Sequence, residues 1–140
     1  LKEMSPVFQR LYSRIGRRAP LYCTGIGKVL MAWLEQPELI AHLQEESFER
    51  RTANTLTSID AYLQELEVVR AQGFAEDHEE FEDNMRCLAA PIRDRFGHVI
   101  GGMSVSFPCF RFREELKQDY VKRLMEATLQ ISRQLGCHVK

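Results

Sequence analysis

The spacing of apolar and polar residues predicts three helices in the first half of the chain. Apolar residues recur every three or four positions over about 24–34, with Thr24 in the N-cap position. A proline at a first helical position opens a short helix over about 37–44, and a polar loop follows it. A longer amphipathic helix starts at Thr57 or Ser58 and ends at Gly73, a residue type that is common at helix C-caps.

Three other stretches carry the patterns of extended chain. Residues 6–15 read as one or two extended segments that end in a basic turn, and residues 74–80 read as a further extended segment. The clearest prediction is a β-hairpin with strands at 85–93 and 98–107, joined by the turn sequence Asp94-Arg95-Phe96-Gly97.

A long amphipathic helix is predicted over about 113–135, followed by Gly136. Its core-facing stripe should consist of apolar residues at helical spacing, namely Leu116, Tyr120, Leu124, Ala127, Ile131 and Leu135. Helices grouped around consecutive antiparallel strands indicate an α+β domain.

Composition limits the classes of function that this segment can serve. The 140 residues, 44% of them hydrophobic, suit one compact domain with a real core and leave no room for a second. Lys and Arg number 19 against 20 Asp and Glu, for a net charge of -1. Nothing in that balance attracts nucleic acid over long range, so binding of phosphates by this segment alone is not expected.

The four cysteines are far apart and form no CxxC pair, which argues against a zinc finger or a disulfide framework. Reduced thiols in a cytoplasmic protein are expected instead. No signal peptide is recognisable, and no apolar run approaches the roughly 18 residues of a membrane span. The chain starts at Leu1 rather than Met, which suggests a piece of a longer protein.

The helix start Thr24-Gly25-Ile26-Gly27-Lys28 is a candidate anion site. Unsatisfied N–H groups and the positive end of the helix dipole suit a carboxylate or phosphate, and glycine lets the anion approach closely. The alternative is that the two glycines only allow close packing of the helix on the sheet. The pattern alone favours neither reading.

Small polar residues occupy alternate positions of the second hairpin strand. Ser104 and Ser106 share one strand face, with Met103 and Val105 on the other. Alternating serines usually face solvent, but the neighbouring glycines and the apolar Val99-Ile100 favour a pocket wall here. The two hydroxyls can donate and accept hydrogen bonds to a small polar ligand.

The acidic segment 76–80 and the strand that follows hold further candidates. Asp77 either binds a ligand hydroxyl or is one more charge of a solvated loop. Cys87 as a nucleophile would need a nearby base, and none of the histidines lies in a hydrolase motif, so a half-buried structural cysteine is the better reading. His78 and its acidic neighbours lack the spacing of a metal site, and no metal or cofactor is expected.

Four spaced blocks together resemble the effector-binding domain of the IclR family of bacterial transcription factors. The resemblance covers nearly the whole chain and rests on residues 20–30, on 52–57 before the 63–74 helix segment, on 77–92 and on Ser104-Val105-Ser106 with Pro108. It implies a curved antiparallel sheet of about six strands flanked by helices, similar to GAF and profilin-like folds. It also implies an N-terminal winged helix-turn-helix, absent from residues 1–140, that carries operator DNA binding.

The resemblance further implies a non-enzymatic sensor that works as a homodimer or homotetramer and binds a small organic acid or sugar acid. Gly25 and Ile26 would present N–H groups to the ligand carboxylate. Asp77, Cys87, Ser104 and Ser106 would supply side-chain contacts, and the apolar wall would consist of Phe8, Leu11 and Met85.

Two details refine this resemblance. Asn84 stands where the family commonly has glycine three residues before the cysteine, and asparagine tolerates left-handed backbone, so the turn should survive. The block over 12–22 is most similar to enterobacterial regulators of sugar-acid catabolism, which implies a repressor of such genes. The rival functions are a hydrolase that uses Cys87 and an oligomerisation module without a ligand.

Overall fold

The computed structural model describes residues 15–138. The elements in chain order are α1 (Gly25–Ala32), α2 (Gln36–Glu45), α3 (Ile59–Gln72), β1 (Ala75–His78), β2 (Met85–Arg93), β3 (Val99–Pro108), the short 3₁₀ turns η2 (Cys109–Arg111) and η3 (Glu114–Leu116), and α4 (Lys117–Gln134). The predicted extended chain over 6–15 lies outside the described residues except for Ile15. The α+β class is confirmed.

The described strands form one antiparallel sheet in the order β1-β2-β3. Residues paired across neighbouring strands lie on the same face, so the register sorts the side chains into two faces. Ala75, Ala89 and Ser104 belong to one face, and Leu88 and Val105 to the other. Side chains of alternate residues therefore serve two different layers of the molecule.

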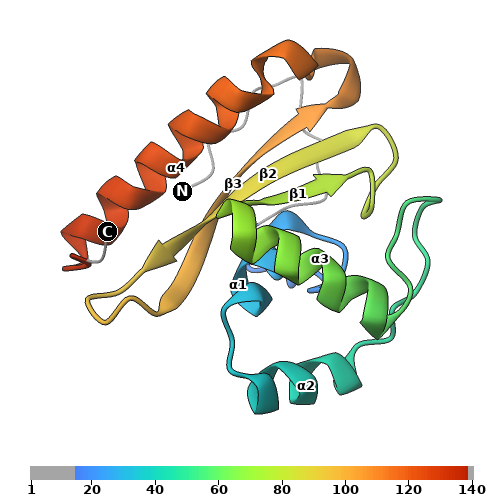
Figure 1. Cartoon of the computed structure of the whole chain (residues 1–140). Coiled ribbons are helices and arrows are strands. Elements are labelled where there is room, and N and C mark those ends of the chain that lie inside the picture. The colour runs from blue at the N-terminus through green and yellow to red at the C-terminus, as the bar shows by residue number, and fades with distance from the viewer. Residues whose placement is uncertain (1–14, 139–140) are drawn as a thin grey trace.

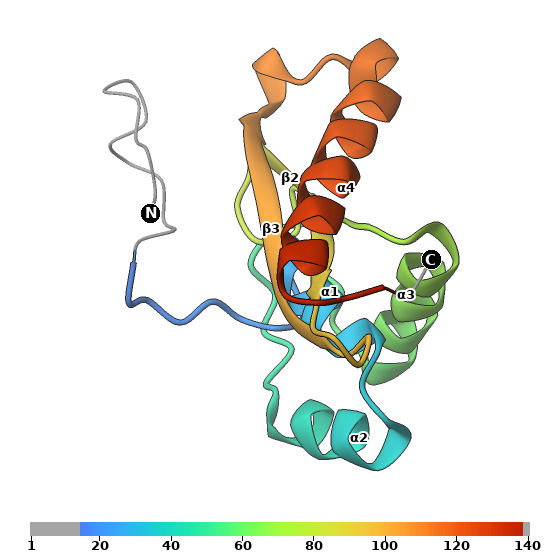
Figure 2. The same cartoon turned by 90° about the vertical axis from the view of Figure 1, so that its left-hand side faces the viewer.

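Each face of the sheet has its own helical layer, as Figures 1 and 2 show. On the first face, Ala75 and Ala89 join a buried cluster with residues of α1, α2 and α3. On the second, Leu88 and Ala90 are buried against Val121 and Leu124 of α4. The sheet is thus the middle layer, with α1 against one face and α4 against the other.

Local signals set the helix ends as predicted. The Thr24 hydroxyl accepts a hydrogen bond from the Gly27 N–H, and the Ser58 hydroxyl accepts one from the Ala61 N–H. Pro37 lies in the first turn of α2. Gly73 ends α3 with a φ of 84°, the left-handed conformation that glycine adopts without steric cost.

The predicted hairpin is confirmed. Its turn is held by the Asp94 carboxylate, which accepts hydrogen bonds from the Phe96 and His98 N–H groups at 2.8 and 3.0 Å. Gly97 has a φ of 83°, which explains glycine at the end of the turn. The pairing is continuous from Met85 to Ile92 and is interrupted only beside Arg93.

Two predictions need correction. Residues 15–138 contribute three strands rather than about six, because the described chain before β1 consists of helices and the loops that join them. The buried stripe of α4 consists of Val121, Leu124, Thr128 and Ser132, whereas Leu135 is exposed. Thr128 and Ser132 tolerate burial because each hydroxyl donates to a carbonyl one turn earlier.

Among residues 15–138, no helix has the length and apolar character that crossing a bilayer requires.

Candidate functional site

A row of three polar side chains crosses the sheet on the face covered by α1. Asp77 of β1 pairs with Cys87 of β2, and Cys87 pairs with Ser106 of β3. The Cys87 Sγ and Ser106 Oγ atoms are 3.1 Å apart and share a hydrogen bond. The register therefore brings together three of the residues that the sequence nominated from separate segments.

The N-terminus of α1 lies beside this row. A Cβ atom added to Gly25 would stand 3.1 Å from the Ala89 Cβ and 3.9 Å from the Cys87 Cβ. Ile26 contacts β3, since a Cβ on Gly102 would meet its Cδ1 at 3.1 Å. Ser104 pairs with Ala89, so it lies on the same face as the Gly25 contact.

The first turn of α1 presents donors that the helix itself does not use. The Thr24 hydroxyl accepts from the Gly27 N–H at 3.1 Å and donates to the Pro20 carbonyl at 2.7 Å. Helix geometry leaves the N–H groups of Gly25 and Ile26 without an intrahelical acceptor. With the positive end of the helix dipole, they suit one carboxylate of a small ligand.

The structure gives both glycines of this turn a packing role. A Cβ atom added to Gly27 would stand 2.2 Å from the Leu21 carbonyl oxygen, which is too close for any side chain at this position. Gly25 allows α1 to lie directly on Ala89. Close packing thus explains both residues, and it is the same packing that brings the donors of α1 to the polar row.

Asp77 is 3% exposed, and its Oδ1 atom accepts a hydrogen bond from the Glu80 N–H at 2.8 Å. Burial raises the pKa of this carboxyl to about 6, against the lowering effect of that hydrogen bond. The sequence left open whether Asp77 faces a ligand or belongs to a solvated loop. It is buried at the Cys87 row and also fixes the turn that follows β1.

This burial predicts a pH effect on stability. The folded pKa of Asp77 is raised, so the folded state holds a proton that the unfolded state has lost, and stability should fall as pH rises from about 4 to about 6. The contribution is about 3 kcal/mol at most. Urea unfolding at a series of pH values measures this decrease in the free energy of unfolding, and Asp77→Asn should lack it. The exposed Asp83→Asn should keep the decrease. If the wild type and both variants show the same dependence on pH, the effect does not come from Asp77.

Cys87 does not have the surroundings of a nucleophile. Burial raises the pKa of its thiol to about 11, which keeps it protonated near neutral pH. His78 is close in sequence to the row, but it pairs with Arg86 and so belongs to the opposite face of the sheet. Within residues 15–138, no hydrogen bond joins Cys87 to a histidine.

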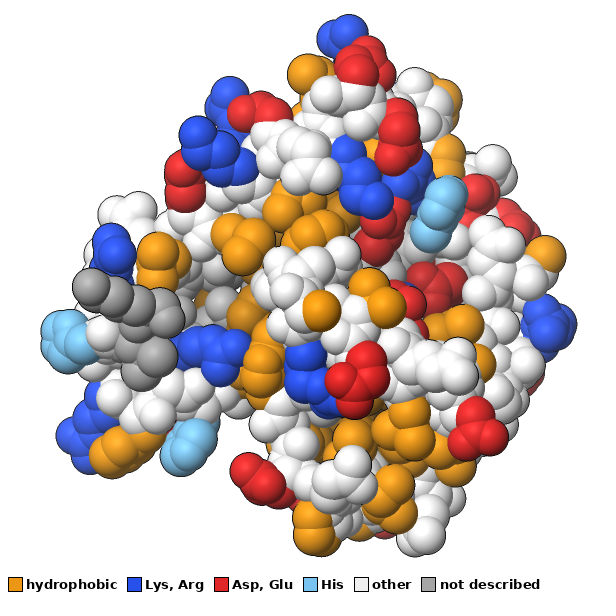
Figure 3. All heavy atoms as spheres, in the orientation of Figure 1, with side chains coloured by type: hydrophobic (Ala, Val, Ile, Leu, Met, Phe, Trp, Pro, Cys, Tyr) orange, Lys and Arg blue, Asp and Glu red, His pale blue; other side chains and the backbone are white. Residues whose placement is uncertain are grey.

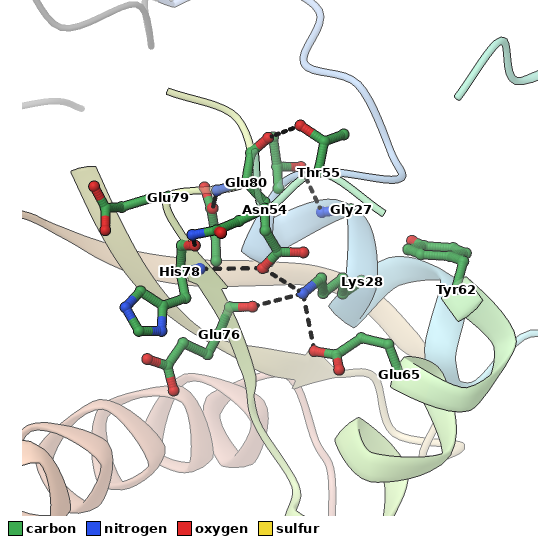
Figure 4. Close-up of polar contacts among 12 residues, drawn as sticks. Gly27, Lys28, Asn54, Thr55, Tyr62, Glu65, Glu76, His78, Glu79 and Glu80 are labelled. Atoms are coloured by element: carbon green, nitrogen blue, oxygen red, sulfur yellow. Dashed lines mark hydrogen bonds and ion pairs between the residues drawn. The ribbon is translucent and has the colours of Figure 1, made fainter. Parts of the chain in front are cut away.

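Sequence reasoning missed the most tightly bound charge of this region, Lys28. Its side chain is 1% exposed, and Nζ donates to Glu65 Oε1 at 2.9 Å, to Glu80 Oε2 at 2.8 Å and to the Glu76 carbonyl at 2.7 Å. Figure 4 shows these three bonds converging on Nζ from α3 and β1 and from the turn after it. The three donors of the ammonium group are all used.

The loop between α2 and α3 clamps the turn that follows β1. The hydroxyls of Thr52 and Thr55 donate to the Glu79 and Glu80 carbonyls at 2.6 and 2.7 Å. The Asn54 side chain donates to the His78 carbonyl at 3.1 Å (Figure 4). The block over 52–57 therefore acts through the backbone of β1 and its turn, and it holds Asp77 in place from outside the site.

The other predicted residues are placed as follows. Met85 lies on the same face as Cys87, two residues earlier in β2, and is half-buried. Asn84 has a φ of 64°, so the left-handed turn expected of it is confirmed. Ser104 and Ser106 are exposed, and Phe8 and Leu11 lie outside the described residues. No group of three metal-ligating side chains occurs in the described part of the chain.

A helix start with unused N–H donors, placed beside a row of hydroxyl, thiol and carboxyl groups, is typical of a site for a small polar ligand. Residues 2–133 match the family model of the bacterial transcriptional regulator IclR C-terminal domain. The chain belongs to this IclR C-terminal family.

Its relatives are named as transcriptional regulators. The chain is 52% identical over 129 residues to the HTH-type transcriptional regulator KdgR of Escherichia coli K12, covering 92% of this chain and 49% of that protein. The chain therefore spans about half of the length of this relative.

Solved structures agree with the fold. The crystal structure of the C-terminal domain of E. coli KdgR has a TM-score of 0.83 at 50% identity, covering 86% of this chain and 74% of that one. The Thermotoga maritima IclR structure has a TM-score of 0.85 at 35% identity, covering 91% and 51%.

Proposed function

We propose that this chain is the effector-binding domain of a DNA-binding transcriptional regulator and that its ligand is a small carboxylate. The observation that carries the proposal is the position of the α1 N-terminus over the polar row. Gly25 and Ile26 offer N–H donors for a carboxylate, while Ser104 and Ser106 offer hydroxyls for the oxygen atoms of a keto or hydroxy acid. Asp77 and Cys87 close the row on the β1 side.

The ligand class follows from the charges and hydrogen-bonding groups at this site. A helix N-terminus favours an anionic group, while the hydroxyl and thiol groups of the row, with the Asp77 carboxyl as an acceptor for a ligand hydroxyl, favour a polar but uncharged remainder. A small hydroxy or keto acid, including a sugar acid, has this combination. Phe8 and Leu11 stay predicted members of an apolar wall, together with Met85.

The regulator as a whole would read operator DNA through an N-terminal winged helix-turn-helix that residues 1–140 do not contain. The near-zero net charge of this chain supports that division, since a DNA-binding surface is usually basic. The likeness to KdgR supports a transcriptional regulator. From the family resemblance we further propose a cytoplasmic repressor of sugar-acid catabolic genes, built as a homodimer or homotetramer on a GAF-like or profilin-like sensor fold.

Regulation requires that the effector bind two quaternary arrangements with different affinity, because equal affinity shifts no equilibrium. A coupling free energy of about 1–3 kcal/mol is enough. The raised pKa of the Cys87 thiol and the absence of a hydrogen-bonded histidine within residues 15–138 count against the rival hydrolase. The rival oligomerisation module makes no use of the free donors at α1.

A thermal-shift screen of this chain against keto acids, hydroxy acids and sugar acids tests the proposal. One chemical series should raise Tm in a concentration-dependent way, because a ligand of the native state stabilises it. If no acid raises Tm at millimolar concentration while the chain still self-associates in sedimentation, the oligomerisation module becomes the better explanation.

The paired variant Ser104→Ala with Ser106→Ala should weaken binding of the acid found in that screen by about tenfold to a hundredfold, as expected for two lost hydrogen bonds to a charged or strongly polar ligand. The exposed Val105→Thr, which lies between them on the opposite face, is the matched control and should bind normally. Calorimetry gives both affinities. Wild-type affinity in the serine variant would remove these residues from the site.

A further inference from the structure

The outer edge of β3 has no partner strand within residues 15–138. β3 lies at one end of the sheet order β1-β2-β3 and is, with ten residues, the longest of these strands (Figure 1). The outer side of an edge strand carries backbone N–H and C=O groups that have no ladder partner. The edge of β3 is therefore a surface that can accept another strand through main-chain hydrogen bonds.

The hydrogen-bonding pattern identifies the backbone groups that face this edge. The Cys109 N–H donates to the Asn84 carbonyl at 2.8 Å, just beyond the last paired residues of the hairpin. Because the residues of an antiparallel strand bond to one neighbour alternately, the odd-numbered residues from 101 to 107 bond to β2. Pro91 fits this pattern, since it has no N–H and lies opposite an even-numbered residue. The residues whose backbone groups point to the open edge include Gly102, Ser104 and Ser106.

The opposite edge of the sheet, β1, is protected against strand addition. It is only four residues long and carries the charged residues Glu76 and Asp77. Glu76 is paired with Arg86 and Lys117, and Figure 3 shows acidic and basic side chains together over β1 and the turn after it. Short length and charged side chains are common ways in which proteins keep an exposed edge from pairing.

β3 has neither protection. Between Val99 and Phe107 it contains no charged residue and no proline, and its one irregularity lies at its start, opposite Arg93. Ile100 and Val105 are 57% and 41% exposed. A long uncharged edge with exposed apolar side chains favours association, so we expect this edge to be covered in the complete protein.

The likeness to KdgR favours a segment of the same polypeptide as the partner of this edge. This chain covers 49% of the whole E. coli KdgR and 74% of its solved C-terminal domain, so that relative has unmatched residues within the domain as well as outside it. A segment joined to the domain is also present at a high effective concentration, which a separate molecule is not.

We propose that a strand from the part of this protein that precedes residue 1 pairs with the outer edge of β3. The inference rests on the proposed function, in which a DNA-binding domain lies N-terminal to this chain and a segment joins the two. A second copy of this chain is the alternative occupant that an experiment must separate.

Such a strand would lie beside the proposed effector site. The side chains of Ser104 and Ser106 lie on the face covered by α1, while their backbone groups point to the open edge. Side chains of the added strand at the paired positions would continue the row formed by Asp77, Cys87 and Ser106. An effector bound there would contact the segment that leads to the DNA-binding domain, which gives binding a direct route to the rest of the regulator.

Amide hydrogen exchange tests this pairing, because two neighbouring glycines report the two sides of β3. In the full-length protein the Gly101 N–H should be protected by β2 and the Gly102 N–H by the added strand. In residues 1–140 alone, Gly101 should stay protected, whereas Gly102 should exchange about a hundredfold faster or more than in the full-length protein. NMR of protein that is isotope-labelled at glycine measures both amides.

Two results would overturn the proposal. Free exchange of Gly102 in the full-length protein, with Gly101 protected, would show that the edge is open. Protection of Gly102 in residues 1–140 alone would show a different occupant, which is a second copy if the protection decreases on dilution and this chain itself if it does not. Neither result depends on effector binding, which the thermal-shift screen measures separately.

A charge on the edge strand provides a second test within the full-length protein. Val105→Lys places an ammonium group at an exposed position of β3. If a strand covers this edge, the variant should lower the Tm of the full-length protein by about 3 °C or more and speed the exchange of Gly102. Val68→Lys, at a 50% exposed position of α3, is the matched control and should change neither. Equal Tm values of the two variants would contradict a covered edge.

Discussion

Lys28→Met should lower the free energy of unfolding by about 3–5 kcal/mol, the cost of leaving a buried carboxylate without its partner. Glu80 is 6% exposed, and its Oε2 atom faces the Lys28 ammonium at 2.8 Å. Methionine has similar length and fills the space without a charge, so the effect reports the uncompensated Glu80 rather than a cavity. Urea unfolding at neutral pH measures it.

Two further proteins make this prediction specific. Arg123→Met removes an exposed cation that bonds Asp119 at 2.9 Å on α4, and it should cost no more than about 1 kcal/mol. Adding Glu80→Gln to Lys28→Met removes the buried charge and should recover part of the loss. A loss under about 1 kcal/mol in Lys28→Met, equal to that of the surface control, would show that Glu80 is not held by Lys28.

Gly27→Ala should destabilise the protein by about 3 kcal/mol or more, at the upper end of the usual cost of overpacking. The added Cβ would stand 2.2 Å from the Leu21 carbonyl oxygen. This segment cannot move away cheaply, because the Tyr62 hydroxyl donates to the same carbonyl at 2.7 Å and the neighbouring Tyr22 is 2% exposed. The helix start would have to shift, so the N–H groups of Gly25 and Ile26 would also leave the proposed effector site.

Gly101→Ala is the matched control, since a Cβ added there meets no atom within 4 Å. It should change the free energy of unfolding by less than about 1 kcal/mol. Thermal unfolding and calorimetric titration with the acid found in the screen report the two effects of Gly27→Ala. If this variant is as stable as Gly101→Ala, the contact between α1 and Leu21 is looser than the structure has it.

Local interactions made several parts of this protein predictable from sequence. The N-caps Thr24 and Ser58, the C-cap Gly73 and the Asp94 turn each depend on residues within a few positions of one another. The alternation that places Ser104 and Ser106 on one face is likewise a property of a single strand. These features were predicted because the residues that cause them are neighbours in the chain.

Longer-range contacts explain what was predicted wrongly or missed. The apolar pattern of α4 suggested Leu135 as a core residue, but the helix buries Thr128 and Ser132, because Ser132 accepts the N–H of Arg93 from another element. Lys28 looked like an ordinary residue of the first helical turn. Its burial depends on Glu65 and Glu80, which are 37 and 52 positions away.

The sequence by itself determined the order of the helices and of the described strands, the capped ends of α1 and α3 and the family to which the chain belongs, since periodicity, capping and spaced motifs are properties of the linear chain. Only the tertiary structure decided which side chains meet. Strand register joined Asp77, Cys87 and Ser106 into one row, and the contact of Gly25 with Ala89 placed the donors of α1 beside it. Register and helix packing are set by the burial of whole faces, which depends on residues far apart in the chain.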